Sequence, residues 1–381
     1  MNTYKSNNII LIIGNGFDLA HGLKTSYNDF ANWFITKIEE EIVTYLTTRS
    51  NPDFFHKNFI EYFNKERYTH VNFQSYEILS AIQSYLWASF RTKKMNTVLI
   101  NNLDKIESHL ISNKFLGKLY NNQYKNWFDI ENAYFQELIL IKGDRTKVTD
   151  LKTREYIIKK LNQLNNELVE IKNYLNEYLE TIKPSYNRDV KTFFDYNLQV
   201  NPKKNLYIVN FNYTNTVRDY ITGFDGDNPY IKSVNTNYIH GNLRQKNIIF
   251  GYGNDQHKEY QNIKDLEINE FLENFKTFEY LKNNNYSRIY DDILDNNSID
   301  DYIVFVLGHS LGATDKTLLE EIFNNEKCKQ IHLFKRRDLE NDDENLKKSF
   351  NDLVFSASRI LTNEKDLRKK ILNYENSEFF P

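Results

Sequence analysis

An uninterrupted apolar stretch near the start of the chain most restricts the folds that this sequence can adopt. Residues 8–13 read Asn-Ile-Ile-Leu-Ile-Ile and are followed at once by Gly14, Asn15 and Gly16. Because neighbouring side chains of a strand point to opposite faces, a run that is apolar on both faces must be covered on both sides. This pattern is typical of a central strand in a parallel sheet. The sequence therefore predicts an α/β fold.

Helical periodicity replaces the strand pattern over most of residues 28–199. The most regular apolar set has alternating spacings of four and three residues: Ile157, Leu161, Leu164, Leu168, Ile171, Leu175, Tyr178 and Ile182. Such spacing forms the seam between packed helices. We expect an antiparallel helical hairpin here, with a contact between copies of the chain, in a homo-oligomer, as the alternative.

Strand patterns return after this segment. Runs rich in Ile, Val, Phe and Tyr occur at 206–209, 238–239, 248–250, 302–307 and 331–334. Helical spacing separates some of them and continues in the tail from 343 to 374. We therefore expect a Rossmann-like sheet domain from residues 1–27 and 200–340, a helical insertion over 28–199, and a C-terminal helical segment over 341–381.

Composition narrows the classes of function. The 381 residues include 49 Lys and Arg against 52 Asp and Glu, a net charge of −3, whereas nucleic-acid-binding domains usually show a basic footprint. The one cysteine, Cys328, excludes an intramolecular disulfide and a zinc site made of several cysteines. No apolar run approaches the roughly 20 residues of a membrane-spanning helix. We expect a cytoplasmic protein that needs no metal and whose partner is a small molecule.

Polar or glycine-rich segments follow four of the predicted strands, at the edge where open α/β sheets bind ligands. In the first, Gly14, Asn15 and Gly16 would let a phosphate approach backbone N–H groups at a helix start, and Asp18 could hold a ribose hydroxyl. Leu19 stands where the dinucleotide-binding motif has its third glycine. A tight turn without a ligand explains this segment equally well.

The second and third segments hold the candidate catalytic groups. Asn212 follows one strand, and its amide could position a water or a sugar hydroxyl; an Asx turn or helix cap is the alternative. His240 ends another strand beside Gly241, which leaves space for the ring to act as a general base. A structural histidine is the competing interpretation.

The fourth segment matches a nucleophile motif. Residues 308–312 read Gly-His-Ser-Leu-Gly, the G-x-S-x-G pattern of serine hydrolases. Such a hydrolase needs an acid and then a histidine after Ser310, but the one later histidine, His332, lies inside a strand-like run. We therefore favour a ligand-binding turn in which Ser310 faces a nucleotide and Thr314 or Asp315 caps the next helix.

Together these segments resemble the bacteriophage abortive-infection family AbiH. The resemblance spans most of the chain and rests on the segments at 12–27, 126–131, 211–214, 239–241 and 308–312. It implies a role in bacterial defence against phage, with a phage-derived trigger. Asp129 and Glu131, in the second segment, lie two residues apart on a predicted helix and do not share a face. Their role is either on the helix surface or in contact with the site.

The same order of segments resembles, more distantly, the sirtuin-like NAD-binding fold of defence NADases. This resemblance implies NAD as the ligand, cleavage to nicotinamide and ADP-ribose, and catalysis by Asn212 and His240. It assigns NAD binding to a larger set: Gly14, Asn15, Gly16, Asp18, Gly22, Leu23, Thr214, Gly241, Gly308, His309, Ser310 and Asp315. The zinc module and Asp-Phe-Arg loop of deacetylases are missing, which argues against protein deacylation. A nucleotide sensor without turnover is the alternative.

Overall fold

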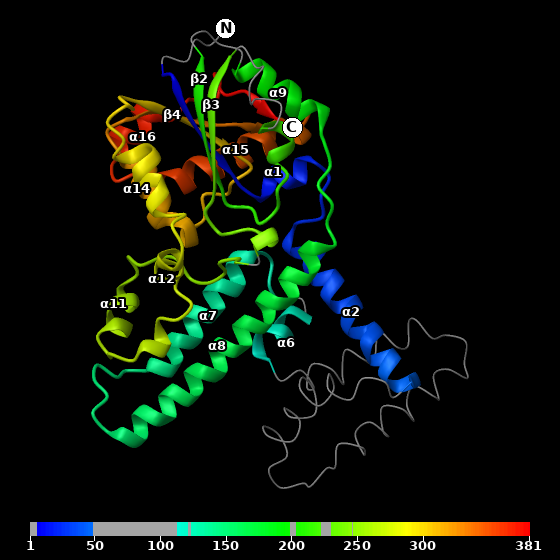
Figure 1. Ribbon diagram of the computed structural model, residues 1–381, viewed down its shortest axis with the longest axis vertical. Helices are drawn as coiled ribbons and strands as arrows, with labels where there is room; N and C mark the ends of the chain where they lie inside the picture. Colours follow the sequence, from blue (N-terminus) through cyan, green and yellow to red (C-terminus); the bar gives the residue numbers. More distant parts are fainter. Residues whose placement is uncertain (1–5, 49–112, 121–122, 199–202, 222–229, 246) are drawn as a thin grey trace. The chain divides into compact units, whose positions relative to one another are not determined.

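The computed structural model describes residues 6–48, 113–120, 123–198, 203–221, 230–245 and 247–381 (Figure 1). In these ranges the chain has a mixed α/β fold with a central parallel sheet, as the apolar run at 8–13 predicts. No helix in the described ranges is both long enough and apolar enough to cross a membrane.

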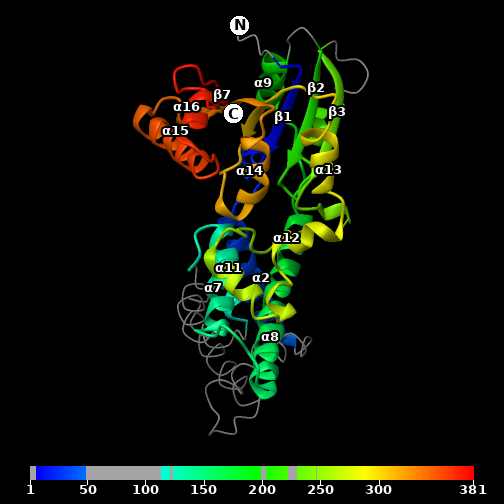
Figure 2. The same cartoon turned by 90° about the vertical axis from the view of Figure 1, so that its left-hand side faces the viewer.

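Five parallel strands form the sheet in the order β3-β2-β1-β4-β5. Their bounds are β1 Asn8–Ile13, β2 Lys204–Asn210, β3 Ile231–Tyr238, β4 Tyr302–Leu307 and β5 Cys328–Leu333. β1 lies in the centre, where Ile10 is in register with both Tyr207 and Val304. Figure 2 shows β1, β2 and β3 side by side. All carboxyl ends meet at one edge, called the carboxyl edge below, and the strand order changes direction between β1 and β4.

Alternate residues of β1 enter two separate cores, one on each face of the sheet. Ile10 and Ile12 pack on the face that carries α14 and α15, and the other apolar residues of β1 pack on the face that carries α1, α9 and α10. These helices are α1 Asn15–Ala20, α9 Arg188–Leu198, α10 Arg218–Ile221, α14 Lys316–Asn324 and α15 Asp343–Ser358. Each fully buried Ile contributes about 1.5–3 kcal/mol. Burial on both faces explains why this strand has no polar interruption.

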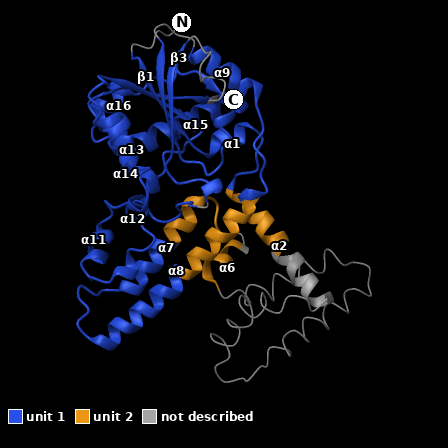
Figure 3. Ribbon diagram, in the orientation of Figure 1, with its two compact units in different colours: residues 1–26, 134–165, 179–381 blue, residues 27–133, 166–178 orange. Residues whose placement is uncertain are grey.

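The chain divides into two compact units (Figure 3). Unit 1 comprises residues 1–26, 134–165 and 179–381 and contains the sheet; unit 2 comprises residues 27–133 and 166–178. The described helices that lie wholly or partly in unit 2 are α2 Tyr27–Thr48, α6 Lys114–Tyr120, α7 Trp127–Lys142 and α8 Leu151–Glu180. Aromatic rings hold unit 2 together: Phe30 lies 5.2 Å from Trp127 and 5.7 Å from Tyr178 between ring centroids. The expected domain boundaries at 28, 200 and 341 stay predictions.

Seven of the eight residues of the regular seam lie on α8, and the eighth, Ile182, follows the end of that helix. The seven on α8 are each at most 5 % exposed, buried by the chain itself: Ile157, Leu161, Leu164, Leu168, Ile171, Leu175 and Tyr178. Inside unit 1, the Tyr134 hydroxyl on α7 donates to Asn165 Oδ1 on α8 at 2.7 Å. This is the packing expected of a helical hairpin. A contact between copies of the chain stays a prediction.

Short helices fill most of the remaining chain. Between β3 and β4 they include α11 Lys258–Lys264, η4 Asn269–Phe271, α12 Lys276–Glu279, η5 Tyr280–Lys282, α13 Ser287–Ile289 and η6 Tyr290–Leu294. The turns carry η3 Leu243–Gln245, η7 Ala313–Asp315 and η8 Arg337–Leu339. The tail forms α15 and α16 (Glu364–Lys370), which confirms its helical spacing.

Two strand predictions differ from the structure. Residues 248–250 form no strand: they are a buried coil that attaches through the Ile249 N–H to the His240 carbonyl at 2.8 Å. The strand predicted at 238–239 is instead β3, which ends at Tyr238 and is mostly polar because it lies at the sheet edge. A second small sheet of β6 (Lys335–Arg336) and β7 (Phe379–Phe380) was not predicted, because two-residue strands carry no period.

Candidate functional site

The turns after β1 and β4 are packed against each other. The Gly14 N–H donates to the Leu307 carbonyl at 3.0 Å, and the Gly16 N–H donates to the Gly308 carbonyl at 2.7 Å. Gly308 has a φ of +69°, and a Cβ there would overlap the nitrogen of Phe17. The glycines are therefore explained by close approach of two backbones. The two N–H groups expected to hold a phosphate already donate inside the protein.

A buried polar cluster lies behind the first turn. The Thr214 hydroxyl donates to Asp18 Oδ2 at 2.6 Å, and Thr216 lies next to Thr214 at 3.2 Å between hydroxyl oxygens. The Asn212 side chain donates to the Gly14 carbonyl at 3.0 Å. Burial raises the pKa of Asp18 despite the opposing polar contacts with Thr214, Thr216 and Asn212. Asp18 is 1 % exposed, so a ribose reaches it only if this cluster opens.

The side-chain amide of Asn212 does not form an Asx turn. That turn is made by Asn210, whose Oδ1 accepts from the Asn212 N–H at 2.9 Å. The Asx turn considered as an alternative for this segment is therefore present, but Asn210 makes it. The Asn212 side chain instead connects the ends of β2 and β1. It holds these two strand ends in place from inside.

A second cluster, the aspartate cluster below, surrounds Asp315 with His240, His309 and Lys276. Asp315 Oδ1 lies 3.1 Å from His240 Nε2 and 3.0 Å from Lys276 Nζ, and its Oδ2 lies 3.4 Å from His309 Nε2. The Tyr280 hydroxyl is 3.0 Å from His240 Nε2. Asp315 precedes α14, yet its side chain makes no cap hydrogen bond. The expected helix cap is thus replaced by a buried ionic contact.

The hydrogen-bond partners of His309 and His240 indicate which ring nitrogen of each carries the proton. The Leu311 N–H donates to His309 Nδ1 at 2.9 Å, so His309 carries its proton on Nε2, facing Asp315. A carboxylate only accepts, so neutral His240 also presents Nε2–H to Asp315. Its other nitrogen, Nδ1, makes no hydrogen bond with any residue that the structure describes. His240 therefore has an available lone pair.

The pKa values of His240 and Asp315 are both lowered, for different reasons. Burial, assisted by the nearby Lys276, lowers the pKa of His240 against the opposing effect of Asp315. Burial alone would raise the pKa of Asp315, but Lys276 and His240 hold it well below its usual range. At neutral pH the cluster is thus a carboxylate with a neutral His240. This is the state in which a histidine can accept a proton.

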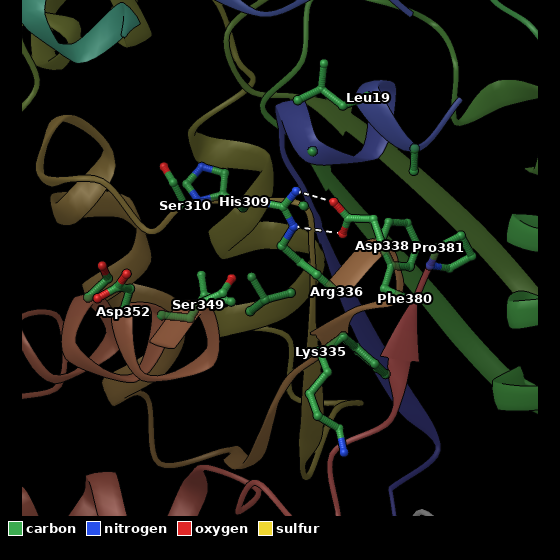
Figure 4. A pocket seen from close by; sticks show the side chains of 17 residues that line it. Leu19, His309, Ser310, Lys335, Arg336, Asp338, Ser349, Asp352, Phe380 and Pro381 are labelled. Atoms are coloured by element: carbon green, nitrogen blue, oxygen red, sulfur yellow. Dashed lines mark hydrogen bonds and ion pairs between the residues drawn. The ribbon is translucent and has the colours of Figure 1, made fainter. Parts of the chain in front are cut away.

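A pocket of about 610 Å³ opens at the carboxyl edge, where the strand order changes direction (Figure 4). Gly16, Gly308, His309 and Ser310 line it from the turns after β1 and β4. Its other lining residues include Lys335, Arg336, Asp338, Ser349, Asp352, Ser356, Phe380 and Pro381. We call it the large pocket. Its position is the one that open α/β sheets use for ligands.

A smaller pocket of about 170 Å³ lies beside the aspartate cluster. Tyr280, Thr314 and Asp315 line it, together with residues of the 253–286 segment and α14. His309 lines the large pocket and contacts Asp315, which lines the small one. The aspartate cluster therefore connects the walls of both pockets.

The structure brings some predicted residues together and separates others. Four predicted NAD-binding residues share the large pocket: Gly16, Gly308, His309 and Ser310. Neither Asn212 nor His240 lines that pocket, and each belongs to its own cluster.

The remaining predicted residues lie at the start of α1 or in turns. Asn15 begins α1, while Gly22 (φ +69°) and Leu23 follow its end. Gly241 has a φ of +73° and is packed on the Asn247 carbonyl, so the space expected beside His240 is filled.

The side chains that the sequence did not indicate include Lys276, Tyr280, Lys335 and Arg336. Lys276 and Tyr280 lie in a segment without a strong period, and nothing in its pattern indicates the aspartate cluster. Arg336 follows β5 by three residues and could have been found, because strand ends at this edge hold functional groups.

The serine-hydrolase alternative does not fit the geometry. Ser310 makes no hydrogen bond with any described residue, and the positive φ angles of this turn lie at Gly308 and Leu311, not at the serine. His332 lies inside β5 in register with Phe305, and burial lowers its pKa to about 4. Among the described residues, therefore, no histidine hydrogen-bonds to this hydroxyl.

The acidic pair on α7 belongs to unit 2. Asp129 Oδ2 accepts from the N–H groups of Lys125 and Asn126 at 2.7 and 3.2 Å, so it stabilises the turn before the helix. Glu131 is 5 % exposed. The two side chains thus have different environments, in line with their spacing.

Fold and site define an α/β protein with a ligand-sized pocket at the point where a parallel sheet changes direction, beside a buried acid–base cluster. The sequence model of the family described as bacteriophage abortive infection AbiH matches residues 10–335. The chain belongs to this family, as the sequence resemblance predicts. A comparison with curated proteins finds no match.

Proposed function

We propose that this chain acts in abortive infection by binding NAD at the carboxyl edge and hydrolysing the bond between nicotinamide and ribose. The observation that carries this proposal is the contact of His240 Nε2 with Asp315 Oδ1 at 3.1 Å, which leaves Nδ1 of a neutral ring without a partner among the described residues. A carboxylate that orients an imidazole is the arrangement that a general base needs. The family description supports the role in defence.

The reaction needs one base and one ordered water. Water attacks C1′ of the nicotinamide ribose, the C1′–N bond breaks, and its electron pair neutralises the positive charge of the nicotinamide ring. His240 takes the proton of the attacking water, and Asp315 stabilises the imidazolium that forms. Asn212 orients the sugar or the water. Each side chain is expected to contribute on the order of 10²–10⁴ in rate.

The large pocket supports the binding part of the proposal. Its volume of about 610 Å³ lies within the roughly 300–1,000 Å³ that is usual for small-molecule sites. It combines apolar surface from Leu19, Phe334 and Phe380 with hydroxyl and basic groups. This mixture suits a nucleotide, which has flat bases, sugars and phosphates.

The proposal predicts NAD turnover that depends on the aspartate cluster. Purified protein is incubated with NAD, with and without lysate of phage-infected cells, and nicotinamide release is followed by chromatography. We expect His240→Gln and Asp315→Asn to lower the rate by roughly 10²-fold or more, since each removes the oriented base. His257→Asn, which keeps the cap of α11, is the matched control and should retain the wild-type rate.

Two results would contradict NAD hydrolysis by this site. One is release of nicotinamide at the wild-type rate by both His240→Gln and Asp315→Asn. The other is activity that disappears with Ser310→Ala but survives both cluster variants, which would indicate serine chemistry instead.

A second function, a nucleotide sensor without turnover, is favoured by one observation. The proposed catalytic side chains Asn212 and His240 do not line the large pocket. Saturable NAD binding without nicotinamide release, in the presence and absence of infected-cell lysate, would select the sensor.

A further inference from the structure

The large pocket contains a basic side chain with the geometry of an anion-binding fork. Arg336 extends into its centre in Figure 4, and 60 % of its side chain is exposed. Its Nε and one terminal nitrogen donate to the two carboxylate oxygens of Asp338 at 3.0 and 2.5 Å. A planar guanidinium binds phosphate through the same pair of donors.

A phosphate in this pocket needs side-chain donors. The N–H groups of Gly14 and Gly16 donate to carbonyls of the β4 turn. Helix α1 has only six residues, so it offers little more at its start. Arg336 lies in the same pocket as Gly16 and Gly308 and carries a full positive charge. It is therefore the group best suited to an anionic ligand there.

Hydroxyl groups without a partner among the described residues line the same pocket as Arg336. Ser310, Ser349 and Ser356 line the pocket, and none of their hydroxyls hydrogen-bonds to a described residue. Asp352 also lines the pocket and forms no ion pair within the described ranges. Hydroxyls donate to phosphate oxygens, whereas a carboxylate repels them and accepts from sugar hydroxyls instead. The pocket thus combines donors for phosphate oxygens with an acceptor for sugar hydroxyls.

The Arg336–Asp338 pair is weak enough to exchange. Both side chains are 60 % exposed, and exposed ion pairs contribute little to stability. The carboxylate of Asp338 has the charge and the two oxygens that a phosphate would present to the same fork. Asp338 therefore competes with any phosphate for Arg336.

We propose that Arg336 binds the phosphate groups of a nucleotide in the large pocket. In the absence of ligand, the Asp338 carboxylate is paired with the Arg336 guanidinium, and the phosphate displaces this carboxylate. The proposal deepens the proposed function, on which its choice of NAD as ligand rests. It assigns phosphate recognition to a strand-end arginine and makes Asp338 a residue that sets the affinity threshold.

Calorimetric titration of the full chain with NAD, ADP-ribose and inorganic pyrophosphate tests the proposal. Arg336→Gln should weaken all three by roughly tenfold or more, because it removes a charge-assisted hydrogen-bond pair. Asp338→Asn should tighten all three by about two- to fivefold, the range that an exposed ion pair allows. Adenosine, which has no phosphate, should bind both variants as it binds the wild type.

The chain supplies a matched control next to this pair. Arg337 and Glu340 form an ion pair at 3.7 Å with similar exposure, 52 % and 49 %, but neither lines the pocket. Arg337→Gln and Glu340→Gln change the same charges and should leave all three affinities unchanged. If the control and pocket variants change the affinities equally, the changes come from the overall charge of the protein and not from a contact in the pocket. That result would overturn the proposal.

The outcomes separate this inference from NAD hydrolysis. If nicotinamide is never released but affinities follow the Arg336 and Asp338 pattern, phosphate recognition stands and hydrolysis falls. If nicotinamide is released and Arg336→Gln binds all three phosphates as the wild type does, hydrolysis stands and the Arg336 assignment is wrong. The gain expected from Asp338→Asn cannot be produced by misfolding.

Discussion

At the scale of single residues, the aspartate cluster is the most demanding feature of this chain. A buried carboxylate is tolerated only when cations and donors surround it, and Asp315 has contacts to Lys276, His240 and His309. Removing one partner of such a buried pair typically costs about 3–5 kcal/mol, whereas exposed pairs contribute about 0–1 kcal/mol. The cluster is therefore sensitive to change whether or not it is catalytic.

Buried histidines predict a loss of stability in mild acid. Burial lowers the pKa of His332 in β5 to about 4 from 6.5. Below pH 6.5 the unfolded chain binds more protons than the folded one, so the free energy of unfolding falls as pH decreases, by up to about 1.4 kcal/mol per pH unit. His332→Leu should remove this contribution and flatten urea-unfolding stability between pH 6.5 and 4. Equal pH slopes for the variant and the wild type would contradict the prediction.

Protonation of His240 also lowers the free energy of unfolding as the pH decreases. Burial lowers its pKa, so its contribution is also complete above pH 6.5 and decreases as the pH falls below that value. Asp18 acts in the opposite direction, because its raised pKa favours proton uptake by the folded state just above pH 3.8. The His332→Leu comparison isolates one histidine, since both other groups are common to the two proteins.

At the scale of elements, the packed turns after β1 and β4 predict a graded set of glycine substitutions. Gly308 and Gly22 share a φ of +69°, but a Cβ at Gly308 would overlap the Phe17 nitrogen, whereas none of the described atoms lies within 4 Å at Gly22. Gly22→Ala should cost about 1–2 kcal/mol for the left-handed backbone alone. Gly308→Ala should cost clearly more, because one of the two turns must also move.

Urea unfolding of both glycine variants measures the difference. Similar losses at the two positions would mean that backbone strain alone explains the glycines. The close packing of the β1 and β4 turns would then contribute little to stability.

Predictability from the sequence also differs among elements. β1 and β4 were predictable because every one of their residues is buried, which leaves a continuous apolar run. β3 was not, since an edge strand keeps polar residues such as Asn235 and Thr236. The positions of Ser310 and His309 at a ligand-sized pocket were predictable from strand ends. Lys276 was not, because only tertiary packing brings it to Asp315.

At the scale of the whole molecule, we expect the buried seam of α8 to stabilise the single chain rather than to join copies of it. Leu161 is fully buried by its own chain, whereas Val169 on the same helix is 43 % exposed. Leu161→Ala should lower the free energy of unfolding by about 2–5 kcal/mol, and Val169→Ala should change it by less than about 0.5–1 kcal/mol. Sedimentation should give the same mass for the wild type and both variants. A mass that falls with Leu161→Ala would indicate instead that the seam joins copies of the chain.

During biosynthesis, β1 must wait for β2, the first strand that it can pair with. Roughly 190 residues separate these two strands, so β1 leaves the ribosome about 10–40 s before its first partner at usual translation rates. During that time an Ile-rich strand has two unpaired edges, which is a hazard for aggregation. Newly made chains should therefore depend on chaperones that shield the first strand, and slower translation should lower the yield of folded protein. A defence protein of this design is most vulnerable while it is being made.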